Sequence, residues 1–185
     1  SSDVTVQTNL LEARLITGNR PLFEEMRETL AQHLGKRAFF LAKQQEQTQR
    51  HTRFVDTDYN LEPNLKESPG GLRDLQTVLW ISRACGFGTS WQELARLGMI
   101  TLPEARAITR HESLLQTLRI RLHYLAGRRE DRLLFDYQTA LAEQMGIAAS
   151  PTRRASEHLM QHYYRTKQAV LQLNSVLLQN LRARL

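Results

Sequence analysis

The chain has 185 residues, the length of one domain, and its 41% hydrophobic and 24% charged residues exclude a chain that is mostly disordered. Its longest apolar run, residues 38–42, is far shorter than the roughly 20 residues of a membrane-spanning helix, and its one cysteine, Cys85, cannot form an internal disulfide. Lys and Arg number 25 against 19 Asp and Glu, and the net charge of +6 favours anionic partners weakly. We therefore expect a cytoplasmic protein without a membrane partner.

Helical periodicity dominates the first part of the chain. A short helix is predicted over residues 10–16, and a second from Pro21, which suits a first helical turn, to about His33. A long helix over residues 36–55 follows. We expect its second half to be largely solvated, because residues 43–53 are all polar.

Residues 56–71 are rich in turn formers and too long for a simple connector, which predicts an ordered loop with a function. The helical pattern resumes over residues 72–85 and ends at Gly86. The spacing S/T-x-x-E at residues 90–93 and 101–104 predicts two further helix starts, because the hydroxyl and the acid of such a capping box each bond a backbone N–H group.

Three helices are predicted in the C-terminal part: one over residues 103–125, one that ends near Met145, and a last one from Pro151, capped by Ser150, to Leu185. Apolar residues recur in the last helix at spacings near seven. This pattern indicates packing inside a bundle or, alternatively, a dimer seam.

Only residues 4–6 alternate as a strand would, so almost no sheet is expected. The fold class is therefore all-α, a multi-helix bundle with a long ordered loop and a long C-terminal helix.

The most informative part of the loop runs from Lys66 to Asp74. Gly70 and Gly71 allow the backbone to approach a ligand closely, and the helix after them presents unpaired N–H groups that suit a phosphate. Lys66 and Arg73 add cations. Asp74 would repel phosphates unless a divalent ion lies between them, so the set predicts part of a metal and nucleotide site. The structural alternative is an acid stabilised by the helix dipole after a simple turn.

Several stretches of the sequence resemble the signature of bacterial PII uridylyltransferase/uridylyl-removing enzymes. The most characteristic is Asn-Leu-Glu-Pro-Asn-Leu-Lys at residues 60–66, followed by Ser-Pro-Gly-Gly-Leu-Arg-Asp-Leu at residues 68–75. Further similar stretches lie at residues 3–15, 121–138 and 157–165.

The resemblance implies a part of an enzyme that transfers UMP from UTP to a tyrosine of the PII nitrogen-regulatory protein, with Mg²⁺, and removes it when glutamine is plentiful. Residues 1–18 would be the junction with a nucleotidyltransferase domain, and residues 19–185 a helical, substrate-binding domain. Glutamine would act through modules that this chain does not contain.

The family's catalytic motifs are not found in this chain. A Gly-Gly or Gly-Ser turn followed by a metal-binding Asp-x-Asp pair is missing, and Asp56-Thr57-Asp58, which precedes the glycines, is interpreted as a solvated turn. The hydrolytic His-Asp dipeptide is missing as well. We expect an excised piece of a longer protein, catalytically inert by itself.

The pattern Lys, Gly-Gly, Arg, acid is shared with glutamine synthetase adenylyltransferase. By that resemblance Asp74 is a catalytic residue and a metal ligand, and Lys66, Gly70, Gly71 and Arg73 bind the nucleotide. The adenylyltransferase has a second acid where this chain has Gln76, which favours the uridylyltransferase. The adenylyltransferase domain and a non-catalytic helical interaction module are kept as alternatives.

Two other patterns carry less weight. His158 and His162 have the spacing of zinc ligands, but no third ligand is evident. Acidic residues interrupt the basic run at residues 128–132, so no nucleic-acid partner is expected.

Overall fold

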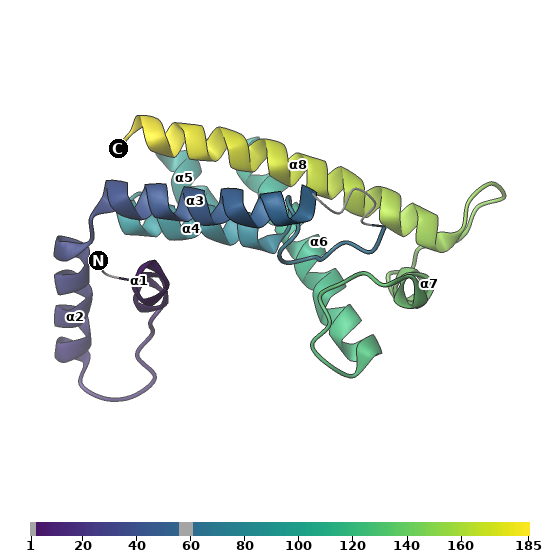
Figure 1. Cartoon of the computed structure of the whole chain (residues 1–185), viewed down its shortest axis with the longest axis horizontal. Helices are drawn as coiled ribbons and strands as arrows, with labels where there is room; N and C mark the ends of the chain where they lie inside the picture. Colours follow the sequence, from purple (N-terminus) through teal and green to yellow (C-terminus); the bar gives the residue numbers. More distant parts are fainter. Residues whose placement is uncertain (1–2, 56–60) are drawn as a thin grey trace.

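The computed structural model describes residues 3–55 and 61–185, which form eight helices and, within these ranges, no sheet (Figure 1). The all-α prediction is confirmed. The helices are α1 (Val4–Leu11), α2 (Arg20–His33), α3 (Lys36–Val55), α4 (Leu72–Cys85), α5 (Trp91–Arg96), α6 (Leu102–Ala126), α7 (Phe135–Gln144) and α8 (Ala155–Ala183). No helix in the described part of the chain has the length and apolar character needed to cross a membrane.

Local sequence signals set most helix ends. The two predicted capping boxes are present: Ser90 and Glu93 start α5, and Thr101 and Glu104 start α6. Gly86 ends α4 in the left-handed conformation, with φ of 78°, which glycine adopts without steric cost.

The first helix differs from its prediction. α1 begins at Val4, where the side chain of Asp3 accepts the N–H of Thr5 at 2.8 Å, and it ends at Leu11. The prediction of a helix over residues 10–16 was therefore wrong. The N-cap supplied by Asp3 outweighs the β-branched residues at the start of the helix.

The last helix also begins later than predicted, at Ala155 and not at Pro151. The N–H of Ser150 donates to the carbonyl of Arg153 at 2.9 Å and closes a turn. The helix starts after that turn, where the carboxylate of Glu157 accepts the N–H of Arg154 at 3.2 Å. Pro151 thus lies inside the turn.

α4 is the central helix, with ten of its 14 residues buried. α3 and α8 lie along it and pack against it (Figure 1). α8 also packs against α6 and α7, and the near-heptad seam of α8 faces the bundle. Its most buried apolar residues, all at 1% exposure or less, are Leu159, Tyr163, Val170, Leu177 and Leu181. The seam therefore serves intramolecular packing.

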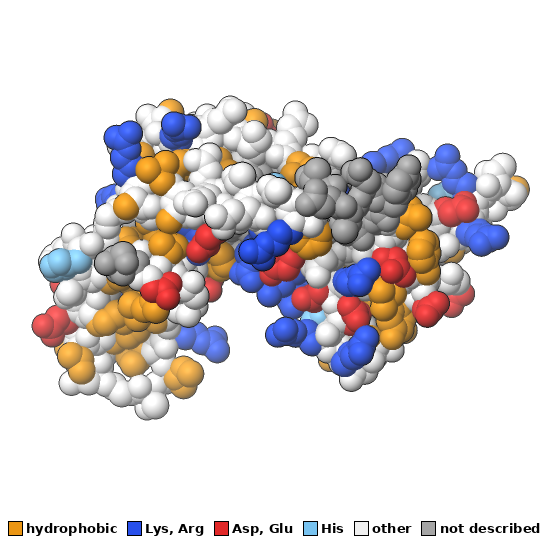
Figure 2. Space-filling view, in the orientation of Figure 1, with side chains coloured by type: hydrophobic (Ala, Val, Ile, Leu, Met, Phe, Trp, Pro, Cys, Tyr) orange, Lys and Arg blue, Asp and Glu red, His pale blue; other side chains and the backbone are white. Residues whose placement is uncertain are grey.

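α2 lies at one end of the molecule against α1, and none of its residues is buried (Figure 1). Hydrophobic side chains show on this lobe in the space-filling view (Figure 2). Ile16 and Leu22, at 83% and 63% exposure, are the most exposed apolar residues of the region.

Candidate functional site

The loop before α4 is ordered by its own side chains over residues 61–71. The Asn64 side-chain oxygen accepts the N–H groups of Lys66 at 2.9 Å and Glu67 at 2.7 Å. The hydroxyl of Ser68 in turn accepts the N–H of Asn64 at 3.0 Å. Asn and Ser are suited to such turns because their short side chains replace backbone acceptors.

The segment at residues 131–133, which follows α6, is hydrogen-bonded to the loop. The N–H of Leu65 donates to the carbonyl of Asp131 at 2.8 Å, and the N–H of Leu133 donates to the carbonyl of Pro63 at 2.9 Å. These bonds join two loops that lie almost 70 residues apart in the sequence. The turn after α6 is therefore part of the same assembly.

Asp131 also ties this assembly to α6 through its side chain. Its carboxylate accepts Nε of Arg119 at 2.6 Å and Nε2 of His123 at 2.9 Å. Burial alone would raise the pKa of Asp131, but the bonds from Arg119 and His123 hold it below its ordinary value.

The first N–H groups of α4 are already paired. The N–H of Leu72 donates to the carbonyl of Leu65 at 3.1 Å, and that of Arg73 to the carbonyl of Lys66 at 2.9 Å. The expectation that these N–H groups are unpaired and available to a phosphate was wrong, because the loop turns back and caps the helix with its own carbonyls.

The two glycines bring the backbone close to other parts of this chain. A Cβ atom on Gly71 would lie 2.8 Å from the carbonyl oxygens of Lys66 and Ser68, so only glycine allows this cap. Gly70 has φ of +78°, and a Cβ atom on it would clash with the backbone carbonyl of Lys167 in α8. A nucleotide-binding role for Gly70 and Gly71 stays a prediction, since packing already accounts for both.

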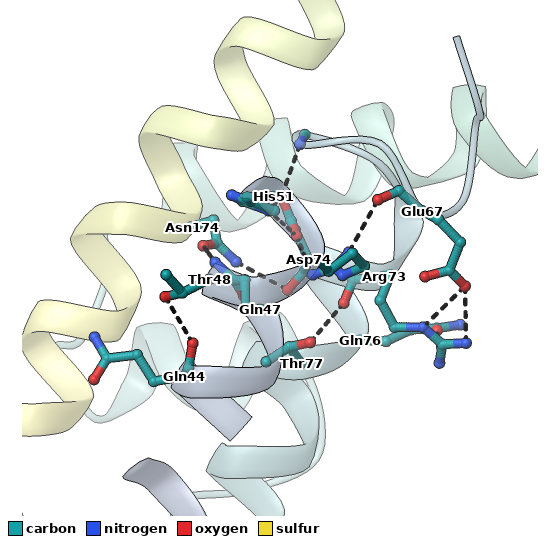
Figure 3. Close-up of polar contacts among 12 residues, drawn as sticks. Gln44, Gln47, Thr48, His51, Glu67, Arg73, Asp74, Gln76, Thr77 and Asn174 are labelled. Carbon is teal, nitrogen blue, oxygen red and sulfur yellow. Dashed lines mark hydrogen bonds and ion pairs between the residues drawn. The ribbon is translucent and has the colours of Figure 1, made fainter. Parts of the chain in front are cut away.

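Asp74 is at the centre of a buried polar cluster and is 0% exposed (Figure 3). One carboxylate oxygen accepts Nη2 of Arg50 at 2.6 Å and Nε2 of His51 at 2.8 Å. The other accepts the N–H of Gly70 at 2.7 Å. A single side chain thus holds together α3, α4 and the loop.

Electrostatics keep this carboxylate ionised. Burial by itself would raise the pKa of Asp74, but the hydrogen bond from His51, the charge of Arg50 and the N–H of Gly70 hold the pKa below its ordinary value. Asp74 is therefore a charged structural residue in this chain.

The arrangement does not fit a Mg²⁺ ion. Both oxygens of Asp74 already have donors, and the side chain has no exposed surface. Within residues 3–55 and 61–185, no group of three or more His, Cys, Asp and Glu side chains could hold a metal. The catalytic and metal-binding roles of Asp74 concern the longer protein and stay predictions.

The two predicted cations lie elsewhere, at the surface. The carboxylate of Glu67 contacts Nζ of Lys66 at 3.4 Å and Nη2 of Arg73 at 3.1 Å. The guanidinium of Arg73 also lies 5.1 Å from the ring centre of Trp80. Lys66 and Arg73 are 25% and 28% exposed, so the structure brings these two together on Glu67 and separates them from the buried Asp74. Figure 3 shows the side chain of Arg73 directed to Glu67.

The polar face of α3 was missed at the sequence level. The second half of α3 was expected to be largely solvated, yet Lys43 is 4% and Gln47 9% exposed, and Arg50 and His51 bind Asp74. These four residues are spaced i, i+4, i+7 and i+8, which places them on one helical face. This spacing is the feature of the sequence from which a buried polar face on α3 could have been predicted.

The remaining sequence candidates do not join this site. His158 bonds the hydroxyl of Ser150 at 3.1 Å. Arg128 and Arg132 pair with acids, Glu130 and Glu62 respectively. Basic and acidic side chains alternate over the face that Figure 2 shows. The Asp-Thr-Asp stretch at residues 56–58 lies outside the described residues.

Comparison with a family model and comparison with individual proteins indicate the same family. The model of the family "GlnD PII-uridylyltransferase" matches residues 38–178. A bifunctional uridylyltransferase/uridylyl-removing enzyme of Nitrosospira multiformis is 61% identical over 99% of this chain and 21% of its own length. Enzymes of the same name from Burkholderia thailandensis and Burkholderia orbicola are 57% identical over the whole chain and 22% of their own lengths. The chain spans about a fifth of these relatives, and no solved structure matches it.

Proposed function

Because this chain belongs to the GlnD PII-uridylyltransferase family, we propose that it is the helical segment of a larger enzyme that transfers UMP from UTP to a tyrosine of the PII protein and also removes it. The observation that carries the proposal is the identity of 57–61% across the whole chain to enzymes named for both activities. Glutamine would act on parts of the enzyme outside these residues.

The segment's contribution would be a rigid loop that presents two cations. Lys66 and Arg73 share the carboxylate of Glu67 at the surface. The loop that holds them is hydrogen-bonded through its backbone to α4 and to the turn after α6, and it packs closely against α8 at Gly70. Phosphate oxygens are stronger partners for a guanidinium than one shared carboxylate, and they would replace Glu67 when UTP binds.

The buried Asp74 would hold this loop in place as a positioning residue. Its bond to Gly70 fixes the turn that immediately precedes the helix carrying Arg73. The Mg²⁺ ligands of the reaction would then come from outside these 185 residues. We accordingly propose that the isolated chain is inactive.

The proposal is tested by assaying transfer of labelled UMP to PII with the full-length enzyme and with the isolated chain. Transfer is expected from the first and none from the second. The adenylyltransferase alternative is assayed in parallel with ATP and glutamine synthetase. AMP transfer without UMP transfer would assign the chain to that alternative, and UMP transfer by the isolated chain would refute its supporting role.

A further inference from the structure

A groove that the proposed function does not use lies between α3 and α8. Both helices pack against α4, and the space between them, about 400 Å³, is lined by uncharged polar side chains together with two leucines of α8, a histidine and an arginine. Figure 3 shows its inner part, where side chains from the two helices approach each other. The lining residues used below are Gln47 on α3 and Asn174, Ser175, Gln179 and Arg182 on α8.

The hydrogen bonds at the base of the groove have a fixed direction. The backbone carbonyl of Asp74 can only accept, and it receives Nδ2 of Asn174 at 2.9 Å. The Oδ1 atom of Asn174 is therefore turned toward Gln47, whose Nε2 donates to it at 2.7 Å. Reversing the amide of Asn174 would lose both bonds, and reversing that of Gln47 would lose the bond between the two amides.

This direction leaves one acceptor without a donor. Oε1 of Gln47 is buried and has no hydrogen-bond partner in the described part of the chain, and Gln47 as a whole is only 9% exposed. A buried acceptor without a donor is costly, and such atoms are rare in native proteins. Because Gln47 lines the groove, a donor from a segment bound there would satisfy this acceptor.

The other lining groups indicate the chemistry of that occupant. Ser175 and Gln179 on the rim supply a hydroxyl and a carboxamide, and a carboxamide carries the same donor and acceptor pair as a peptide group. Arg182 at one end is exposed and has no ion-pair partner within residues 3–55 and 61–185. A peptide backbone that crosses Gln47 and carries an acidic side chain near Arg182 satisfies all of these groups.

We propose that this groove binds an extended segment of the same polypeptide, from the part of the enzyme outside these 185 residues, with an N–H group on Gln47 and an acid at Arg182. The segment's source follows from length: the chain is matched in full by relatives about five times as long. The proposal requires only that the chain is part of a longer protein, and it is independent of the nucleotide site.

Site-specific photocrosslinking in the full-length enzyme tests the proposal. The photoreactive residue p-benzoylphenylalanine replaces Ser175 or Gln179 on the groove rim, and replaces Val176 as the matched control. Val176 is 38% exposed on the same helix but does not line the groove. We expect rim positions to crosslink to one acidic segment of the same chain beyond residues 1–185, mapped by mass spectrometry, and the control to give no such product.

Two further variants identify the contacts. Arg182→Glu is expected to reduce the rim crosslink about five- to ten-fold, while Arg182→Lys retains it, because one charged hydrogen bond is lost or kept. Gln47→Met is expected to reduce it similarly, with thermal unfolding measured alongside. Since Arg182 is exposed, its variants report on the groove even where Gln47→Met fails to fold. No crosslink, a crosslink to a second copy or to added PII, or insensitivity to Arg182→Glu would each overturn the proposal.

Discussion

The carboxylate of Asp74 accepts the backbone N–H of Gly70 at 2.7 Å, so the loop before α4 is fastened to a side chain inside the helix that it precedes. Arg50 and His51 bind the same carboxylate from α3. The conformation of the loop and the packing of α3 on α4 therefore depend on one buried negative charge.

Removing that charge should destabilise the chain strongly. For Asp74→Asn we expect a loss of about 3 kcal/mol in the free energy of unfolding, because Arg50 is left without its buried counter-charge. Urea denaturation followed by circular dichroism measures it. Asp136→Asn is the control: Asp136 is also in the first turn of a helix but is exposed, and its loss should stay below about 1 kcal/mol. Equal losses would refute the role given to Asp74.

The close approach of Gly70 to α8 predicts a position-specific penalty. Gly70 and Gly127 both have positive φ, at 78° and 62°, so alanine costs about 1 kcal/mol at either position for backbone reasons. At Gly70 a methyl group also meets the backbone of Lys167, whereas nothing lies within 4 Å at Gly127. Gly70→Ala should therefore be clearly more destabilising than Gly127→Ala. Losses of the same size would mean that α8 does not press on the loop.

The buried carboxylates predict acid sensitivity. The pKa of Asp74 and that of Asp131 are both held below the ordinary value of 3.8, so the folded chain binds these protons less readily than the unfolded chain does. Their stabilising contribution is complete above that value and is lost as the pH falls below it. Urea midpoints are measured at decreasing pH, starting from pH 6. The midpoint of the unaltered chain should fall steeply once the pH drops below 3.8, and the midpoint of Asp74→Asn should fall less steeply there. An unchanged slope in the variant would contradict the assignment.

Tyr163 carries a buried hydroxyl that offers a stabilising substitution. The residue is 0% exposed, its hydroxyl has no hydrogen-bond partner in the described ranges, and burial raises the pKa of the phenol. Tyr163→Phe keeps the ring and removes the unsatisfied group, so thermal unfolding should be unchanged or correspond to a gain of about 1 kcal/mol. Tyr163→Ala should instead cost about 3–5 kcal/mol through the cavity it leaves. A loss of more than about 1 kcal/mol for Tyr163→Phe would reveal a partner for the hydroxyl.

Signals within a few residues of each other predicted much of the fold. The boxes at Ser90 and Thr101 and the glycine that ends α4 fixed helix ends correctly, because capping is local. The start of α8 was misplaced because Pro151 suits a turn as well as a first helical position, and the choice depends on where Glu157 bonds.

The candidate site was predicted only in part, because its bonds are non-local. The Lys66 to Asp74 stretch was identified as special, but the partner of its acid lies on α3, 24 residues before it. Asn174, which bonds the carbonyl of Asp74, follows it by 100 residues. Residue spacing within one segment cannot predict such contacts, and so the structural role of Asp74 was not predicted, while its role as a metal ligand stays a prediction.

In the proposed function, Lys66 and Arg73 face the nucleotide of the larger enzyme. The most direct test is the kinetics of UMP transfer to PII by full-length Lys66→Met and Arg73→Met, with Arg106→Met, an exposed change on α6, as control and thermal unfolding as a check on Trp80 packing. We expect kcat/KM for UTP to fall about ten-fold or more in the first two variants, because a charged phosphate contact is lost, and to be unchanged in the third. Folded Lys66 and Arg73 variants with the kinetics of the unaltered enzyme would contradict the proposed function and would favour a non-catalytic helical module.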